Sequence, residues 1–331
     1  MKQEATRRAE QLSPPALETA YLGGGTPSML SPTHLEALMS GLRETFAFAP
    51  HAEINLEANP ATFGRETARA FARSGITRVS LGAQSFDSGV LKTLGRTHSP
   101  EDIAHSVNLL RRAGIENVSI DLMFSIPGQS IQQWQRSLQE ALALEPDHLS
   151  AYNLTYEEDT PFFEALQSGA YKEQEELNAS MFELAHETLT ARGYRHYETS
   201  NYSRPGFESR HNQSYWSGRD YLGLGPSAVS TIDGRRWKNV SDTPRYLHQV
   251  AQVGHAEHEI ELLSGAQLDL ERIALLLRTD EGVPRRHLTA VDPGRIADPV
   301  EEGLAEWRND HLRLLGRGPL LVDSIVSHLV T

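Results

Sequence analysis

The chain has 331 residues, of which 39% are hydrophobic and 23% charged, and its formal net charge is −13. This length and composition are typical of a globular protein with a sizeable core and more than one domain. The acidic balance disfavours nucleic-acid binding, because backbone phosphates would be repelled. No apolar run approaches the length of a membrane-spanning helix, and residues 1–10 are too polar for a secretory signal. We therefore expect a cytoplasmic protein that is not integral to a membrane.

The chain contains no cysteine. This excludes disulfides and leaves no thiolate for zinc, for an iron–sulfur cluster or for nucleophilic chemistry. The 14 histidines are then the main candidates for metal ligation, since neutral imidazole is a good ligand.

The first 190 residues alternate short apolar strands with longer amphipathic stretches, in which apolar residues recur at three- and four-residue steps. Ser31 followed by Pro32 predicts a helix start, and Gly75 and Gly114 predict helix ends. Strands are predicted to begin at Leu17, Glu53, Arg78, Asn117 and His148. Helices are predicted over residues 33–46, 66–75, 101–114 and 131–143.

This alternation favours a parallel sheet, either a barrel or a doubly wound fold. Polar or glycine residues follow one strand after another: Gly23–Gly25, Glu57 with Asn59, Gln84, Asp121, and Asn153 with Thr155. A barrel brings those strand ends together in one mouth, whereas an open sheet spreads them along an edge. The sequence therefore favours an α/β fold of the barrel type.

The rest of the chain changes character twice. A helix is predicted over 175–194 and a strand over 195–202, then loops and short strands over 205–237 and a helix over 242–251. From about residue 261, short helices precede a basic strand–turn pair, which indicates a small winged-helix-like module. We therefore predict three parts, 1–195, 196–260 and 261–331. DNA binding by the last part is disfavoured by the acidic balance.

Gly23–Ser28 reads GGGTPS directly after the first predicted strand. Three glycines let the backbone approach a ligand closely and adopt positive φ. A tight strand–helix turn is the alternative interpretation. A phosphate-binding loop is disfavoured, because neither a GKS/GKT nor a GxGxxG pattern is present.

Four segments together carry a resemblance: YLGGGTPSML (21–30), LGAQSFDSGVLKTLGRTH (81–98), IDLMFSIPGQ (120–129) and HNQSYWSGRDYLGLGPSA (211–228). They resemble the HemW branch of the oxygen-independent coproporphyrinogen III oxidase family of radical SAM proteins. The resemblance implies a TIM-type barrel whose first strand leads into a Cys-x3-Cys-x2-Cys loop that holds a [4Fe-4S] cluster. A chain without cysteine cannot support that cluster, so reductive cleavage of S-adenosylmethionine is not expected of it.

The resemblance also implies an incomplete barrel that lacks its first strand and has an open edge beside Gly23. Met1 is followed at once by a mid-helix pattern over residues 2–12. Either a natural cluster-less paralogue or a start codon placed too far downstream would account for this.

The same resemblance assigns an S-adenosylmethionine pocket, if the chain still binds that molecule. Considered singly, Arg96 could pair with a neighbouring acid, and Asp121 could cap a loop. The assigned residues are Gly24, Gly25, Thr26, Glu57, Gln84, Arg96 and Asp121.

The HNxxYW segment, His211 to Trp216, resembles the signature whose histidine is an axial haem ligand. An imidazole suits iron, and Tyr215 and Trp216 would offer flat apolar surface to a porphyrin. A hydrogen-bonded structural histidine is the alternative interpretation of His211. The resemblance makes His211 the predicted haem-iron ligand and haem the predicted cofactor.

The leading functional hypothesis is haem binding and transfer, a chaperone role and not catalysis. By resemblance, the partners would be haem-recipient proteins at the respiratory membrane, and the chain could form a homodimer. One alternative is oxidative decarboxylation of coproporphyrinogen III by a longer form of the protein. Another is a decayed paralogue that folds and binds nothing.

Overall fold

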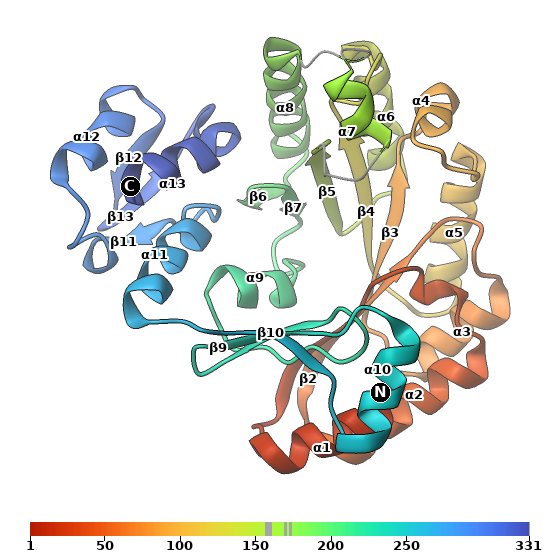
Figure 1. Cartoon of the computed structure of the whole chain (residues 1–331). Helices are drawn as coiled ribbons and strands as arrows, with labels where there is room; N and C mark the ends of the chain where they lie inside the picture. Colours follow the sequence, from red (N-terminus) through yellow and green to blue (C-terminus); the bar gives the residue numbers. More distant parts are fainter. Residues whose placement is uncertain (156–160, 169–170, 172–173, 331) are drawn as a thin grey trace.

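The computed structural model describes residues 1–155, 161–168, 171 and 174–330. Its centre is a curled seven-stranded sheet, in which the five strands of the N-terminal half are parallel and the sixth strand in the sheet order runs antiparallel to both of its neighbours (Figure 1). This arrangement confirms the predicted partial barrel, with the first strand at an edge of the sheet. The strand order is β1 (Leu17–Leu22), β2 (Phe48–Ala58), β3 (Arg78–Gln84), β4 (Asn117–Phe124), β5 (His148–Asn153), β7 (Asn201–Ser203) and β6 (Arg195–Glu198).

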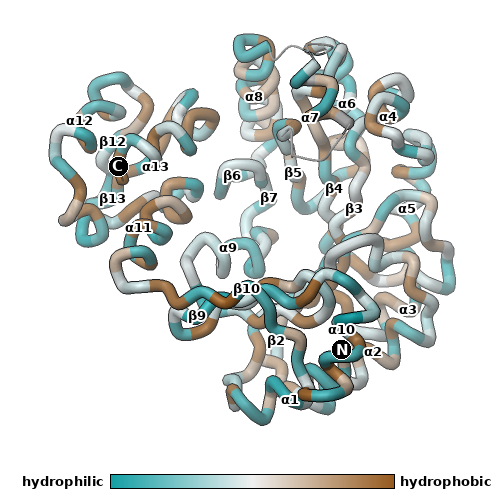
Figure 2. The backbone as a smooth tube through the Cα atoms, in the orientation of Figure 1, coloured by the Kyte–Doolittle hydropathy of each residue, from teal (hydrophilic) through white to brown (hydrophobic). Residues whose placement is uncertain are grey.

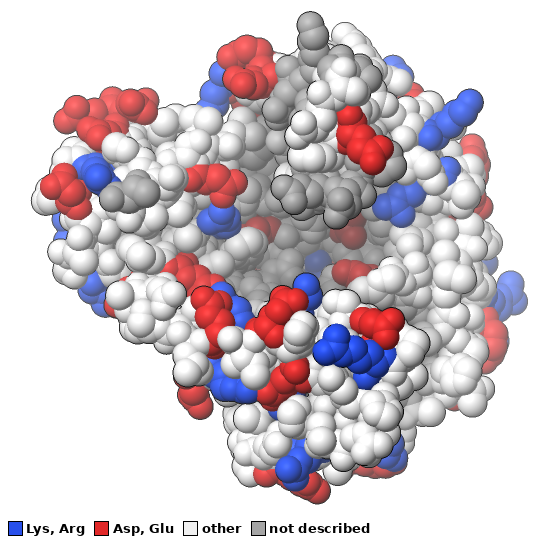
Figure 3. Space-filling view, viewed as in Figure 1, with Lys and Arg blue, Asp and Glu red and all other residues white. Residues whose placement is uncertain are grey.

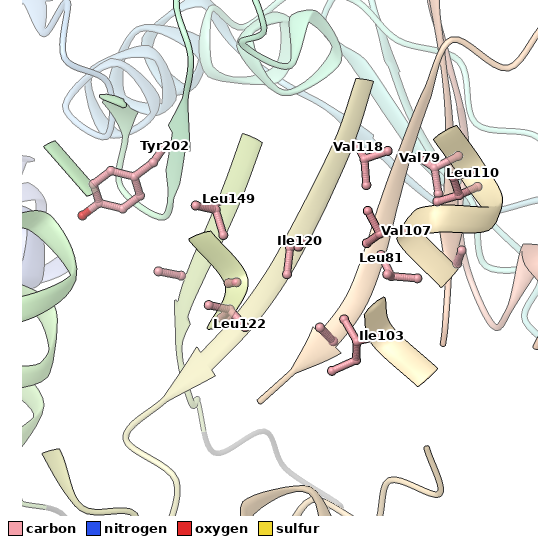
Figure 4. Close-up of a cluster of buried hydrophobic side chains, with 14 of the residues drawn as sticks. Val79, Leu81, Ile103, Val107, Leu110, Val118, Ile120, Leu122, Leu149 and Tyr202 are labelled. Atoms are coloured by element: carbon pink, nitrogen blue, oxygen red, sulfur yellow. The ribbon is translucent and has the colours of Figure 1, made fainter. Parts of the chain in front are cut away.

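Helices follow the parallel strands and pack against one face of the sheet through a continuous apolar core (Figure 4). The predicted helix start is confirmed, since Ser31 Oγ accepts a hydrogen bond from the His34 amide and Pro32 is the first helical residue. Gly75 and Gly114 have φ of +74° and +92°, as helix-ending glycines do. The helices are α2 (Pro32–Thr45), α3 (Arg65–Arg73), α4 (Ser88–Thr93), α5 (Pro100–Arg112), α6 (Ile131–Ala143), α7 (Pro161–Gln167) and α8 (Glu175–Thr190), with a 3₁₀ turn, η1 (Pro27–Met29), after β1.

Alternation along each strand divides apolar from polar side chains. In β3, Val79 and Leu81 belong to the core under the helices, whereas Arg78 and Ser80 line a cavity on the other face. The same two-residue period places Glu57 and Asp121 on the cavity side. The concave face of the half-barrel is therefore polar because every second residue of these strands points toward it, and most of those residues are polar.

A second, three-stranded antiparallel sheet forms from the middle of the chain: β8 (Val229–Ile232), β9 (Arg235–Asn239) and β10 (Glu257–Leu262). The N-terminal helix α1 (Lys2–Leu12) packs against α2 and against α10 (Thr243–Val253). Buried Glu4 accepts hydrogen bonds from Asn239 Nδ2 (2.7 Å) and from the Gly225 amide (3.0 Å). These contacts join the two ends of a span of more than 220 residues.

The prediction of loops and short strands over 205–237 was wrong at residues 210–216, which form helix α9 (Arg210–Trp216). The reason is a pair of caps. Ser209 Oγ accepts from the Asn212 amide, and the distant Glu53 carboxylate accepts from the amides of Arg210 and His211. The second cap lies more than 150 residues away in sequence, so the local pattern could not reveal it.

The last part of the chain has its own core, which includes Ile273, Val283, Leu312 and Ile325. Its helices and three-stranded antiparallel sheet have the winged-helix-like arrangement that the sequence predicted. Figure 2 shows apolar stretches in α11 (Gly265–Leu276) and α13 (Val322–Val330), which contact each other. The elements are α11 (Gly265–Leu276), β11 (Val283–Pro284), η2 (Arg285–His287), α12 (Pro293–Glu301), β12 (Ala305–Arg308), β13 (His311–Leu314), η3 (Gly318–Leu321) and α13 (Val322–Val330).

This C-terminal part is attached along the β6 edge of the large sheet. The Thr199 amide donates to the Arg278 carbonyl (2.8 Å), and the Asp280 amide donates to the Tyr197 carbonyl (3.1 Å). Because β6 and β7 continue the large sheet to Ser203, the boundary predicted at 195/196 falls inside one sheet. The three-part division stays a prediction. Within the described residues, no helix is both long and apolar enough to cross a bilayer.

Candidate functional site

The carboxyl ends of the parallel strands open onto a cavity of about 720 Å³, which lies on the hollowed face of the molecule (Figure 3). Acidic and basic atoms are visible inside that hollow. Six of the seven residues predicted for an S-adenosylmethionine pocket line this one cavity: Gly25, Thr26, Glu57, Gln84, Arg96 and Asp121. We call this set, together with Tyr21 and Asn59, the rim.

Gly24 does not line the cavity but orients one of its carboxylates. Its amide donates to Glu57 Oε2 (3.2 Å), and the Tyr21 hydroxyl donates to Glu57 Oε1 (2.7 Å). Gly24 and Gly25 have φ of +79° and +65°, a backbone conformation that glycine adopts at no steric cost. The glycine run is thus both a tight turn and a donor to Glu57, so the two interpretations of GGGTPS are compatible.

On the other side of the rim, Asn59 connects Arg96 to Thr26 by hydrogen bonds. Its Oδ1 accepts from Arg96 Nη1 (3.3 Å), and its Nδ2 donates to Thr26 Oγ1 (3.4 Å). Burial lowers the pKa of Arg96. Among the described residues Arg96 bonds to the Asn59 amide and makes no ion pair, so pairing with a neighbouring acid, the alternative for this residue, does not occur there. Gln84 ends β3 with φ of +64°.

Asp121 is hydrogen-bonded by serines, and the Arg78 guanidinium lowers its pKa from a longer distance. Ser80 Oγ donates to both carboxylate oxygens (2.9 and 2.8 Å), and Ser150 Oγ donates to Oδ1 (2.8 Å). Burial raises the pKa of Asp121, and the serine hydrogen bonds offset part of that rise. Asp121 therefore sits within the strand-borne wall of the cavity and does not cap a loop.

Helix α9 lies on the cavity side of the sheet, near the amino-terminal ends of the strands. His211 Nδ1 lies 2.9 Å from Thr19 Oγ1, and its ring stacks on Tyr21 with centroids 4.9 Å apart. Burial lowers the pKa of His211, and the Glu53 carboxylate opposes that shift. The imidazole is therefore neutral near pH 7, which is the form that ligates a metal.

The two aromatic residues predicted beside His211 are placed differently. Tyr215 meets the His211 ring edge-on, at 4.9 Å between centroids and 89° between planes, and is 39% exposed. The Trp216 indole instead lies beside Glu198, a carboxyl whose pKa burial raises to about 7. The structure thus brings together His211 and Tyr215, and it places Trp216 against a different strand.

Several residues of the site carried no sequence signal of their own. Tyr21, Thr19 and Glu53 occur in strands that the sequence did predict, and their alternation with core residues could have placed them on the cavity side. Their contacts with α9 could not have been found in this way. A buried chain from Ser119 through His148 to the Tyr197 hydroxyl was also missed.

Comparisons with known proteins agree with this geometry. Residues 2–141 match the model of the radical SAM superfamily. The haem chaperone HemW of Mycobacterium tuberculosis H37Rv is 36% identical over 331 residues, which cover 100% of this chain and 85% of that protein. The HemW of Escherichia coli K12 is 39% identical over 94% of this chain and 83% of its own length. This chain belongs to the HemW family.

The coproporphyrinogen III oxidase HemN from Escherichia coli, a radical SAM enzyme, matches the whole chain with a TM-score of 0.85. That match covers 81% of HemN at 24% sequence identity, so the two proteins share the fold. A mitochondrial relative from Bos taurus, named radical S-adenosyl methionine domain-containing protein 1, is 31% identical over 95% of this chain and 76% of its own length.

The radical SAM fold implies a thiolate-held iron–sulfur cluster, and the residues of this HemW-family chain do not fit one. The sequence has no cysteine, and no group of three or more histidine or acidic side chains in the described ranges could hold a metal ion. The rim residues, in contrast, fit an adenosylmethionine-sized ligand in the donors and acceptors that they offer around one cavity.

Proposed function

We propose that this chain binds haem and passes it to acceptor proteins, with His211 as an axial ligand of the haem iron. The observation that carries this proposal is the placement of the imidazole. Nδ1 is held by Thr19, and Nε2 has no hydrogen-bond partner among the described residues. A ring that is neutral, fixed in orientation by one nitrogen and free at the other is suited to iron.

Tyr215 supports the same proposal, because it is partly exposed and meets the imidazole edge-on. A porphyrin bound at Nε2 would gain apolar contact with such a ring. We assign Trp216 a different role from the one predicted. Beside Glu198, it anchors the end of α9 to the sheet.

We further propose that the rim binds S-adenosylmethionine, which Glu57 and Arg96 would hold by hydrogen bonds. Since the chain has no thiolates for a cluster, we derive no reductive cleavage and favour carriage of haem over oxidation of coproporphyrinogen. The names of the HemW relatives support this choice. Cytoplasmic residence, a homodimer and haem-recipient proteins at the respiratory membrane remain parts of the same proposal.

The test is a haemin titration of the purified full chain, followed by the Soret band. The wild-type protein should shift the Soret maximum at one equivalent of haemin, and His211→Ala should lose the shift or weaken binding at least tenfold. His105→Ala, at an exposed position on α5, is the matched control and should bind as the wild type does. Equal Soret spectra for the wild type and His211→Ala would refute the ligand assignment.

A further inference from the structure

Arg78 is a buried cation at the cavity, and the functional proposal above does not use it. Its side chain lines the cavity although the residue is only 4% exposed. The guanidinium makes two hydrogen bonds, both from Nη1, to Asn117 Oδ1 (3.1 Å) and to the Phe207 carbonyl (3.3 Å). No carboxylate of the described residues makes an ion pair with Arg78, although the guanidinium is near enough to Asp121 to lower the pKa of that carboxyl.

This is an unusual environment for an arginine, because buried cations are normally paired with an anion. Three carboxylates line the same cavity, and each has other partners; one of them, Asp323, pairs with Arg278. Glu57 accepts from the Tyr21 hydroxyl and the Gly24 amide, and Asp121 accepts from serine hydroxyls. The cavity therefore holds a cation whose charge no protein carboxylate neutralises at contact.

Strand register places Arg78 at the level of Tyr21, since both pair with Asn55, and far from the Gln84 end of the rim. It pairs laterally with Asn55 on β2 and with Asn117 on β4, at the amino-terminal ends of β3 and β4. Gln84 of the rim lies six residues further along β3, about 20 Å away at the usual rise of a strand. An anion that reaches Arg78 therefore lies deeper in the half-barrel than a ligand group at Gln84.

The cavity wall around Arg78 is shared with helix α9. The Phe207 carbonyl, which accepts from Arg78, lies just before the helix, and Ser209 and Asn212 line the cavity on either side of His211 in sequence. A ligand held at α9 can thus extend a side chain toward the guanidinium. We call Arg78, residues 207–209 and helix α9 with His211 the floor of the half-barrel.

We infer that Arg78 is an anion subsite at this floor, which binds a carboxylate of the ligand that occupies the inner part of the half-barrel. Haem carries two flexible propionates, so the inference rests on the proposed function and assigns one propionate to Arg78. The guanidinium suits this role, because it can bind a carboxylate through two parallel hydrogen bonds.

The test uses a porphyrin without iron, so that ligation by His211 contributes nothing. Mesoporphyrin IX and its dimethyl ester are titrated into the full chain in the same detergent-containing buffer, and porphyrin fluorescence is measured. The wild type should bind the diacid about ten- to a hundredfold more tightly than the diester. Arg78→Gln should bring this ratio close to one, Arg78→Lys should keep part of it, and Arg73→Gln, an exposed arginine on α3, should leave it unchanged.

His211→Ala should also preserve the diacid-to-diester ratio, which separates this subsite from the iron ligand. Failure of haem ligation with a preserved ratio would refute the proposed function alone. Equal affinities for diacid and diester in the wild type would overturn the subsite, and that comparison needs no variant to fold. Weaker binding of S-adenosylmethionine to Arg78→Gln, with porphyrin binding intact, would also overturn it, since the carboxylate bound there would then be that of the rim ligand.

Discussion

The rim and the floor of the half-barrel are built from contacts of very different range. At the rim, Tyr21 bonds to Glu57 and Arg96 bonds to Asn59, pairs that are 36 and 37 residues apart. At the floor, the Glu53 carboxylate binds the His211 amide across 158 residues, and Thr19 meets the His211 ring across 192. The rim joins neighbouring strands of the half-barrel, whereas the floor needs α9 to dock on a sheet that is already formed.

This difference implies that a substitution can disrupt the floor and leave the rim intact. Helix α9 has only seven residues, too few to be stable by itself in water. Its position depends on Glu53, Ser209 and the contacts of His211. The rim instead depends on strand ends that a continuous core supports.

The largest effect is expected from Glu53→Ala, which removes the acceptor of two α9 amides and of Asn55 Nδ2. Because Glu53 is buried, the loss of these charge-assisted hydrogen bonds should lower the free energy of unfolding by about 2–3 kcal/mol in urea titrations. Haem uptake should weaken by a larger factor than binding of S-adenosylmethionine. Glu18→Ala, at an exposed acid on the neighbouring strand, should change stability by less than about 0.5 kcal/mol. If Glu53→Ala lost affinity for haem and for S-adenosylmethionine by the same factor, the floor and the rim would not be separate.

The same difference in range explains what the sequence could reveal. Strand positions, the ends of α2, α3 and α5, and the polar residues after the strands follow from local periodicity and capping. Six of the seven predicted pocket residues therefore line one cavity. Helix α9 was missed because one of its caps is Glu53, and the position of Trp216 beside Glu198 could not be predicted because Glu198 belongs to another element. Arg78 gave no signal, since a strand arginine is ordinarily an exposed one.

Tyr21 belongs to both regions, because its hydroxyl donates a hydrogen bond to Glu57 and its ring stacks on that of His211. Tyr21→Phe removes only the hydroxyl, so S-adenosylmethionine should bind about five- to tenfold more weakly while haem binding is unchanged. Tyr21→Leu removes both contacts and should weaken both ligands. Calorimetry with each ligand separates these outcomes, and a loss of haem binding in Tyr21→Phe would show that the two functions of the residue are not separable.

Tyr215 and Tyr152 offer a comparison between two tyrosines that are equally exposed, at 39% each. Tyr215 packs edge-on against His211 and Tyr221, whereas Tyr152 lines the cavity at the end of β5. Tyr215→Leu should cost about 1 kcal/mol of haem affinity, roughly a fivefold change, because an aromatic contact is lost. Tyr152→Leu should leave haem affinity unaltered in the same Soret titration. If the two variants lost haem affinity equally, the porphyrin would lie in the cavity mouth and not beside α9.

The smallest effect concerns pH. Burial lowers the pKa of His211, and the nearby Glu53 carboxylate raises it in part, so the imidazole stays neutral below the usual titration range of histidine. A proton on Nε2 competes with iron, so haem affinity should be constant from pH 8 down to about 6.5 and should fall only in more acidic buffer. Glu53→Gln removes the charge that favours the imidazolium. The pH at which haem affinity has fallen by half, its midpoint, should therefore be lower in this variant than in the wild type. Rim residues have no comparable link to this histidine except through the uncharged Tyr21, so Glu57→Gln should leave the midpoint in place. A midpoint that moved with Glu57→Gln and not with Glu53→Gln would mean that the rim, and not the floor, sets the charge of the haem ligand.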